Sequence, residues 1–145
     1  MRITPERARA LLVTHDHGVL ATVHPERGVD AVPVIYAVDE DLVGIPVDRV
    51  KPKTGTTLQR ERNLQADPRA TLLIEHWDPA DWSALWWVRA SLHRESDPPD
   101  RVTQRLEELL AASYVQYHDR PFSHLLVLRV VALSGWSGER SGGSG

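Results

Sequence analysis

The stretch DAVPVIYAVDEDLVGIPV, residues 30–47, decides the fold. Two runs rich in valine and isoleucine, residues 30–38 and 41–47, are separated only by Asp39 and Glu40. Such runs favour β-strands, and so short a connection predicts an antiparallel hairpin with a tight turn.

A proline interrupts each of these two strands, Pro33 in the first and Pro46 in the second. Proline has no N–H group to donate to a strand ladder. We therefore expect each proline at a bulge, at a sheet edge, or where something other than a strand approaches the backbone.

Outward from the hairpin, the sequence alternates between further strands and a few helices. We expect strands over residues 18–24, 70–77, 82–94 and 124–134, and helices beginning at Pro5 and over residues 54–66 and 98–113. Short turns between consecutive strands predict antiparallel pairing rather than βαβ units. The expected fold is mainly β, a six-stranded antiparallel barrel with peripheral helices.

Length and composition limit the classes of protein to consider. The 145 residues fit a single domain, assigned to residues 1–136, and the Gly/Ser-rich residues 137–145 are expected to form a flexible tail. The net charge of −3 disfavours a general nucleic-acid binder, and no apolar stretch is long enough to span a membrane. The absence of cysteine excludes disulfides, and a cytoplasmic location is expected.

A basic segment is the first candidate site. Residues 49–62 hold five basic residues and one acidic residue, and they include the only two lysines of the chain, Lys51 and Lys53. The segment leads from a predicted strand into a predicted helix, whose unpaired N–H groups and dipole attract anions. Two readings stay open at this point: a phosphate-binding site, or a capped helix with a solvated basic face.

Five tryptophans form the second candidate region: Trp77, Trp82, Trp86, Trp87 and Trp136. Adjacent residues of a strand point to opposite faces, so Trp86 and Trp87 cannot share one environment. We expect one of them in the barrel core and the other against a partner, a ligand or water.

Other kinds of site find no support in the sequence. The seven histidines lack the spacing of a known zinc site, so no metal site is expected. The sequence also lacks a Gly-x-Ser-x-Gly nucleophile motif, a P-loop and a dinucleotide-binding Gly-x-Gly-x-x-Gly motif.

Five stretches together resemble a known family: GVLATV (18–23), AVPVIYAVD (31–39), VDRVKPK (47–53), RERNLQADPRA (60–70) and DWSALWWVR (81–89). They are similar to the pyridoxamine-phosphate-oxidase-like split-barrel proteins, in particular to the actinobacterial F420-dependent oxidoreductases. The resemblance extends from about Thr4 to Trp136. It implies an FMN-binding-like split barrel and a homodimer with the cofactor between the two barrels.

The resemblance also implies a set of cofactor-binding residues. Lys51, Lys53 and Thr54 would hold a phosphate, with Arg60 or Asn63 in support. The ring would lie against Pro33, Val34, Ile35, Tyr36, Pro46, Val47 and Asp48, and Trp77, Trp82, Trp86 or Trp87 would contact it from the second subunit. Catalytic residues are not identified, and Tyr36 and Asp48 are the nearest candidates for proton handling.

The expected function is an oxidoreductase that uses reduced coenzyme F420 to transfer hydride to a small organic acceptor. Three alternatives stay open: an FMN-dependent oxidoreductase, a non-enzymatic flavin- or deazaflavin-binding protein, and a heme or tetrapyrrole binder. The stretch similar to the family finishes in Ser-Gly-Trp-Ser, residues 134–137, where true pyridoxamine-phosphate oxidases carry a substrate-binding Arg/His motif, which disfavours vitamin B6 as substrate.

Overall fold

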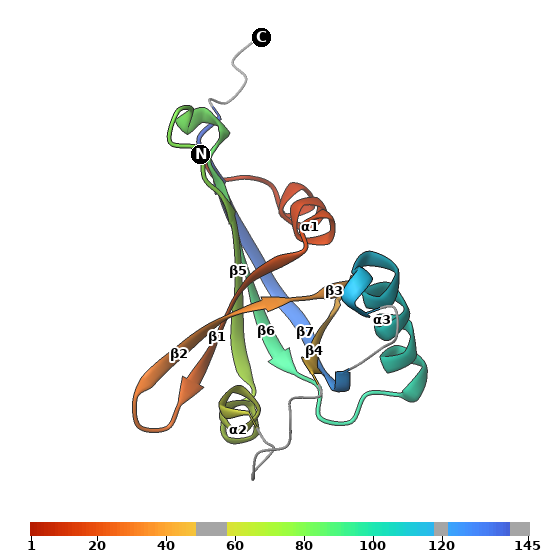
Figure 1. The fold of residues 1–145 in the computed structure, drawn as a ribbon. Helices are drawn as coiled ribbons and strands as arrows, with labels where there is room; N and C mark the ends of the chain where they lie inside the picture. Colours follow the sequence, from red (N-terminus) through yellow and green to blue (C-terminus); the bar gives the residue numbers. More distant parts are fainter. Residues whose placement is uncertain (49–57, 118–121, 140–145) are drawn as a thin grey trace.

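The computed structural model describes residues 1–48, 58–117 and 122–139. Within them the chain forms seven strands and three α-helices (Figure 1). In chain order these are α1 (Pro5–Thr14), β1 (His17–His24), β2 (Gly28–Ile35), β3 (Ala37–Asp39), β4 (Leu42–Asp48), α2 (Gln59–Ala66), β5 (Arg69–His76), β6 (Trp86–Arg94), α3 (Asp100–Ser113) and β7 (Phe122–Ser137). The expected fold class, mainly β with antiparallel strands and peripheral helices, is confirmed.

The seven strands form one curled sheet in the order β2-β1-β5-β6-β7-β4-β3, and every pairing is antiparallel. The two edge strands, β2 and β3, are separated in the chain by Tyr36 alone. Because one residue cannot span a flat sheet of this width, the sheet must curl until its two edges approach each other. The short strand β3 covers only Leu42–Gly44 of β4. The barrel is therefore split between β2 and the remaining part of β4.

Tyr36 is the point at which the structure differs from the sequence prediction for residues 30–38. The expected single strand is two strands, so the count is seven rather than six. The Tyr36 side chain is buried, and its hydroxyl donates a hydrogen bond to the Leu12 carbonyl at 2.6 Å. This bond ties the bend between β2 and β3 to the end of α1, which no local signal in an alternating apolar run could indicate.

Three element boundaries also differ. Trp82 lies in a short 3₁₀ turn, Trp82–Ala84, whose start is capped by the Asp81 carboxylate, so β6 begins only at Trp86. The helix expected from residue 54 begins at Gln59, and residues 54–57 lie outside the described residues. The last strand runs through Ser137, three residues further than expected.

The inner face of the sheet and two helices form the core. Leu20, Leu72, Ile74, Val88 and Leu128 are buried on neighbouring strands. In Figure 1, α1 and α2 lie toward opposite ends of the barrel, and they contribute buried residues to the same core cluster. The third helix, α3, packs instead on the outside of β4, where Leu106 lies against Gly44.

Both strand prolines occupy the kind of position that was expected. Pro33 lies in β2, at one edge of the sheet. Pro46 lies in β4 beyond the residues that pair with β3, and the register shifts at the next step, between Val47 and Asp48.

The two ends of the chain meet. The Met1 amino group donates to the Ser137 carbonyl at 2.6 Å, and the Arg7 guanidinium pairs with the Glu139 carboxylate at 3.1 Å. The first residues of the expected tail are thus part of the fold, and residues 140–145 lie outside the described residues. None of the described helices is long and apolar enough to cross a membrane.

Candidate functional site

A pocket of about 270 Å³ lies where the barrel is split. We call it the split pocket; it is lined by His17, Pro33, Val34, Ile35, Ile45, Pro46, Arg60 and Tyr117. Its walls come mainly from β2, β4 and the first turn of α2, with His17 of β1 and Tyr117 at the edge. The fold thus brings together five of the predicted cofactor-binding residues: Pro33, Val34, Ile35, Pro46 and Arg60.

The other residues predicted on these elements lie differently. Val47 and Tyr36 are buried, and the Tyr36 hydroxyl is held by Leu12 inside the barrel. Burial raises the pKa of Tyr36, so this phenol keeps its proton near neutral pH. The Asp48 side chain, Lys51, Lys53 and Thr54 lie outside the described residues.

The first turn of α2 carries two charged residues with an unusual feature. Arg60 lines the split pocket, and its Nε atom is buried without a hydrogen-bond partner. The next residue, Glu61, is 7% exposed; one oxygen lies 2.8 Å from His124 Nε2, and the other oxygen, Oε1, is buried without a partner. Glu61 and His124 are 63 residues apart, and no sequence signal linked them.

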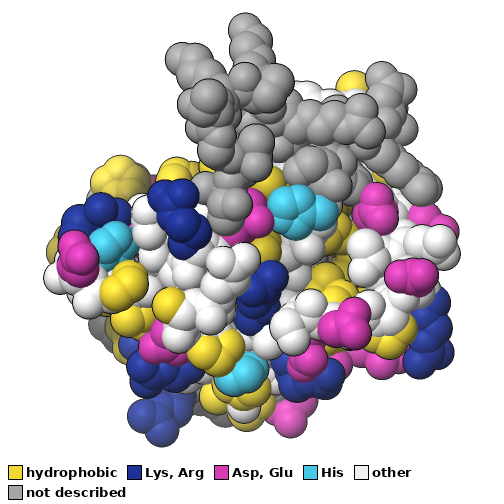
Figure 2. All heavy atoms as spheres, turned by 90° about the horizontal axis from the view of Figure 1, so that it is seen from below, with side chains coloured by type: hydrophobic (Ala, Val, Ile, Leu, Met, Phe, Trp, Pro, Cys, Tyr) yellow, Lys and Arg dark blue, Asp and Glu magenta, His cyan; other side chains and the backbone are white. Residues whose placement is uncertain are grey.

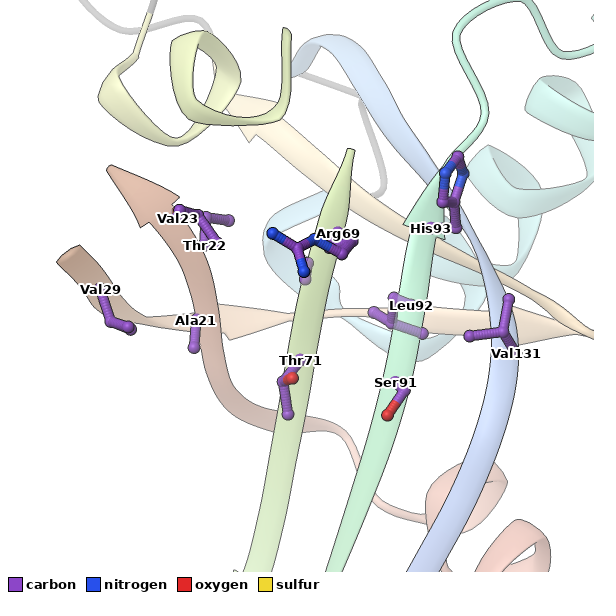
Figure 3. A pocket seen from close by; sticks show the side chains of 11 residues that line it. Ala21, Thr22, Val23, Val29, Arg69, Thr71, Ser91, Leu92, His93 and Val131 are labelled. Atoms are coloured by element: carbon purple, nitrogen blue, oxygen red, sulfur yellow. The ribbon is translucent and has the colours of Figure 1, made fainter. Parts of the chain in front are cut away.

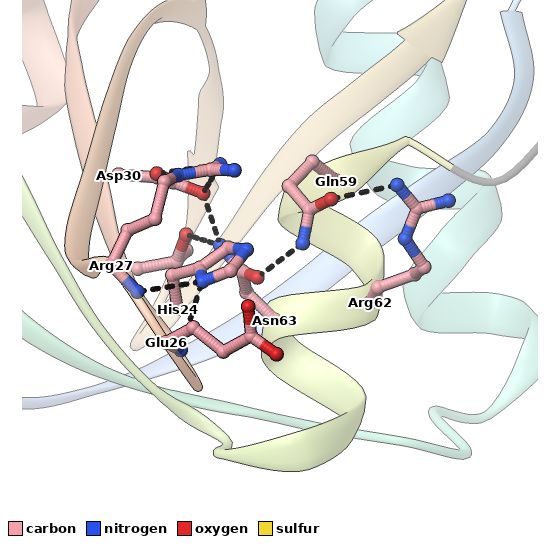
Figure 4. A network of polar contacts seen from close by, with 8 residues as sticks. His24, Glu26, Arg27, Asp30, Gln59, Arg62 and Asn63 are labelled. Carbon is pink, nitrogen blue, oxygen red and sulfur yellow. Dashed lines mark hydrogen bonds and ion pairs between the residues drawn. The ribbon is translucent and has the colours of Figure 1, made fainter.

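Asn63 lies in a network of polar contacts that links α2 to the first two strands (Figure 4). It is fully buried, and its amide nitrogen donates to Thr22 Oγ1 and to the Asp30 carboxylate, both at 2.9 Å. Its amide oxygen accepts a hydrogen bond from Gln59 at 2.8 Å. Asn63 therefore fastens α2 to β1 and β2, and it can support a ligand only by holding this helix in place.

Asp30 completes this network. The hydrogen bond from Asn63, and then the ion pair with Arg27, lower the pKa of the Asp30 carboxyl below its ordinary value. Figure 2 shows the end of the molecule that carries α2: basic, acidic and histidine side chains are interspersed over the described surface.

The tryptophans gather at the other end of the sheet. Trp86 points to the inner face and packs on the core, whereas Trp87 points to the outer face beneath the Arg89 guanidinium, which lies 5.3 Å from the ring centre. The expected opposite orientation of Trp86 and Trp87 is confirmed. A second pocket of about 640 Å³ is lined by Leu73, Glu75, Trp77, Leu85, Trp86, Trp87, Arg89 and Trp136. Trp82 lies beside it, 6.1 Å from Trp77 between ring centres.

The outer face of β1, β5 and β6 carries small and apolar residues, with Arg69 and His93 among the residues that line it. Small residues lie next to one another across β1, β5 and β6, namely Ala21, Thr71 and Ser91, and they form the floor of a shallow pocket of about 400 Å³ (Figure 3). Exposed hydrophobic residues flank this floor: Val19, Val29, Leu73 and Val131. Among the described residues, none of the three helices packs over this floor.

One histidine cluster occurs at the start of β1. His15, Asp16 and His17 bring three potential ligand atoms within 4.8 Å of one another, and Asp16 Oδ1 lies 2.7 Å from His17 Nδ1. Burial, and then the neighbouring His17, lower the pKa of His15. The sequence-based expectation of no metal site stays a prediction.

Taken together, a curled antiparallel sheet whose edges are linked through one residue, with a pocket at the split, defines a split β-barrel. The sequence matches no protein-family model and no curated protein. Several solved structures share the fold. A FAD-binding protein from Mesorhizobium loti superposes with a TM-score of 0.70 and 13% identity, over 93% of this chain and 95% of that chain.

Two further similar structures come from proteins with different described roles. An F420 reductase superposes with a TM-score of 0.58 and 21% identity, over 90% of this chain and 98% of that chain. HutZ, a heme storage protein from Vibrio cholerae, superposes with a TM-score of 0.66 and 13% identity, over 97% of this chain and 100% of that chain. At these identities the similarity establishes the fold and leaves the function to the residues of the site.

Proposed function

We propose that this protein binds a phosphate-bearing flavin-type cofactor in the split pocket, and that the cofactor is coenzyme F420. The observation that carries the proposal is Arg60, whose guanidinium lines the pocket with an unpartnered Nε atom. A buried donor of this kind is the group that an anionic ligand would satisfy. The same fold in an F420 reductase and a FAD-binding protein supports this choice.

The residues present suit such a ligand. Pro33, Val34 and Pro46 offer an apolar wall for a planar ring, and the prolines have no backbone N–H that would need a partner there. The segment 49–57, which contains Lys51, Lys53 and Thr54, joins the end of β4 to the start of α2. Both of its attachment points adjoin the split pocket, so we assign these three residues to the phosphate.

The proposed activity is the transfer of hydride from reduced F420 to an organic acceptor, the chemistry that the deazaflavin supplies when bound. The chain's part is to bind, orient and shield the ring. Because the Tyr36 hydroxyl is buried and donates to the Leu12 carbonyl inside the barrel, we do not assign it a proton-transfer role in this proposal. Assignment to the actinobacterial F420-dependent branch is part of this proposal, and FMN is its nearest rival.

Heme binding is a second candidate, favoured by one observation. His17 lines the split pocket, and its Nδ1 atom pairs with Asp16, an arrangement that orients the imidazole for metal ligation. The shared fold with a heme storage protein supports this alternative. A binding role without turnover is compatible with either cofactor.

We further propose that the protein is a homodimer formed through the outer face of the sheet. The small residues Ala21, Thr71 and Ser91 allow a second layer to approach closely, and the exposed hydrophobic residues around them favour burial. Pro33 and Ile35 project toward this same face, by strand alternation with Val29. A pocket of about 270 Å³ is smaller than a complete cofactor site, which a second copy would supply.

The cofactor proposal is tested by titrating the purified protein with F420, FMN and heme, following tryptophan fluorescence and ligand absorbance. We expect F420 to bind more tightly than FMN and reduced F420 to pass hydride to members of an acceptor panel. Tight FMN binding with weak F420 binding would move the function to the flavin rival. Saturable heme binding alone would establish the heme alternative.

The dimer proposal is tested by Thr71→Arg, which places a long cation on the floor of the outer face. We expect the wild-type protein to sediment as a dimer and the variant to dissociate, because overpacking at an interface costs about 1–3 kcal/mol for each copy. Gln104→Arg on the exposed side of α3 is the matched control and should leave the dimer intact. A monomeric wild type would refute the proposal.

A further inference from the structure

Two buried side-chain polar atoms lack a hydrogen-bond partner in the described part of the chain, and they belong to adjacent residues. They are Arg60 Nε, a donor, and Glu61 Oε1, an acceptor. Buried polar groups are almost always paired, and an unpaired one costs about 1–3 kcal/mol. Two such atoms on adjacent residues of one helical turn therefore call for a physical explanation.

Both atoms lie at the end of β4. Arg60 lines the split pocket together with Pro46 of that strand. Glu61 also lies near this strand end, because its partner His124 on β7 lies opposite Val47 in the sheet register. Both charged residues are thus close to the point where the β4–β7 ladder becomes irregular.

Their chemistry limits what can satisfy both. A guanidinium attracts an anion, but a carboxylate beside it repels a bare phosphate and accepts hydrogen bonds only from donors. A ligand that carries a hydroxyl group next to its anionic group satisfies both atoms at once. Flavin and deazaflavin cofactors have this arrangement, since a hydroxylated sugar-alcohol chain joins the ring to the phosphate.

We propose that Glu61 is a specificity-determining residue that accepts a hydrogen bond from a hydroxyl of the ligand's sugar-alcohol chain, beside the anion bound by Arg60. This inference rests on the proposed cofactor site and adds a residue that recognises the ligand's sugar-alcohol chain. The hydrogen bond between Glu61 and His124 holds the carboxylate so that Oε1 is the oxygen left for the ligand. Both unpaired atoms are buried away from water in this structure. The ligand's sugar-alcohol chain therefore reaches them through a local rearrangement of the protein, and its hydrogen bond to Glu61 is then shielded from solvent.

The test is a double-mutant cycle between protein and ligand. The protein forms are the wild type and Glu61→Met, which keeps the length of the side chain but removes both oxygens. The ligands are the F420 fragment that has the sugar-alcohol chain without the phosphate, and its N10-pentyl analogue, whose chain has no hydroxyl groups. Riboflavin and N10-pentyl flavin replace them if the protein prefers flavins.

Removal of the ligand hydroxyls should weaken wild-type binding about ten- to a hundredfold, the range for a hydrogen bond to a charged group. Glu61→Met should lose a similar factor with the hydroxylated ligand and little with the pentyl analogue. Equal effects on both ligands, or no effect on either, would overturn the inference while the cofactor site stands. Failure of the wild type to bind F420 and FMN at all would instead overturn the proposed function.

A second variant keeps the test decisive if Glu61→Met does not fold. Glu61→Gln preserves the volume and one carbonyl oxygen, but an uncharged amide accepts a hydrogen bond more weakly than a carboxylate. We expect an affinity loss of about three- to tenfold for the hydroxylated ligand and none for the pentyl analogue. An unchanged affinity for the hydroxylated ligand would count against Glu61.

Discussion

The first and second turns of α2 differ in whether their buried polar side-chain atoms have hydrogen-bond partners. In the second turn, Asn63 has its amide nitrogen and oxygen paired with Thr22, Asp30 and Gln59. In the first turn, Arg60 and Glu61 each leave one buried atom unpaired. The comparison separates a structural contact, complete within the chain, from a candidate binding contact that a ligand would complete.

The largest expected effect comes from breaking the completed network. Asn63→Leu keeps a similar branched shape but removes the hydrogen bonds that Asn63 makes with Thr22, Asp30 and Gln59. We expect the free energy of unfolding to fall by about 2–4 kcal/mol, as when a buried hydrogen-bond network is broken. Urea denaturation measures this, and a loss below about 0.5 kcal/mol would show that the network does not hold α2.

The next largest effect is expected on cofactor binding, in the basic segment that precedes α2. Lys53→Ala, in the segment outside the described residues, should weaken F420 binding by about 1.5–3 kcal/mol and leave stability nearly unchanged, because it removes a hydrogen bond to a charged ligand. Calorimetric titration measures the affinity. An unchanged affinity would relocate the phosphate from this segment.

A smaller effect concerns pH. The pKa of Asp30 is lowered in the folded state, so its ionised form stabilises the fold above its ordinary value of 3.8, and that stability is lost as the pH falls through the lowered value. Wild type should therefore have a higher Tm than Asp30→Asn at pH 7, with the difference shrinking below pH 3.8. Melting curves of both proteins between about pH 2.5 and 7 test this. A difference in Tm that did not vary with pH would contradict it.

The smallest effect is expected at the exposed rim of the same network. The Arg27 side chain is 61% exposed and pairs with Asp30 at 3.0 Å. Arg27→Met should cost no more than about 1 kcal/mol, because water screens an exposed ion pair. A cost as large as that of Asn63→Leu, measured by the same denaturation, would mean that the ion pair rather than the amide holds the network.

Much of the fold could be predicted because its signals are local. Alternating apolar residues marked the strands, and Thr4 with Pro5 marked the start of α1, where the Thr4 side chain does cap the helix. The break at Tyr36 could not be predicted in this way. It results from closing the barrel and from the hydrogen bond to Leu12, 24 residues away, so it depends on tertiary structure.

The site was predictable only in part. The resemblance to a known family placed Pro33, Pro46 and Arg60 in one site, and the structure brings them into one pocket. The sequence reading counted Glu61 only as a charge that offset its basic neighbours. Its burial and its pairing with His124 of β7 arise only in the tertiary structure, and a spacing of 63 residues carries no signal by itself.

A crystal structure of the protein with F420 bound would decide where the cofactor lies. We expect the ring against Pro33, Val34 and Pro46, and an anionic oxygen within hydrogen-bond distance of Arg60 Nε. A hydroxyl of the cofactor's sugar-alcohol chain should lie within reach of Glu61 Oε1. A cofactor bound instead in the tryptophan-lined pocket, with Arg60 and Glu61 still unpaired, would refute the proposed site.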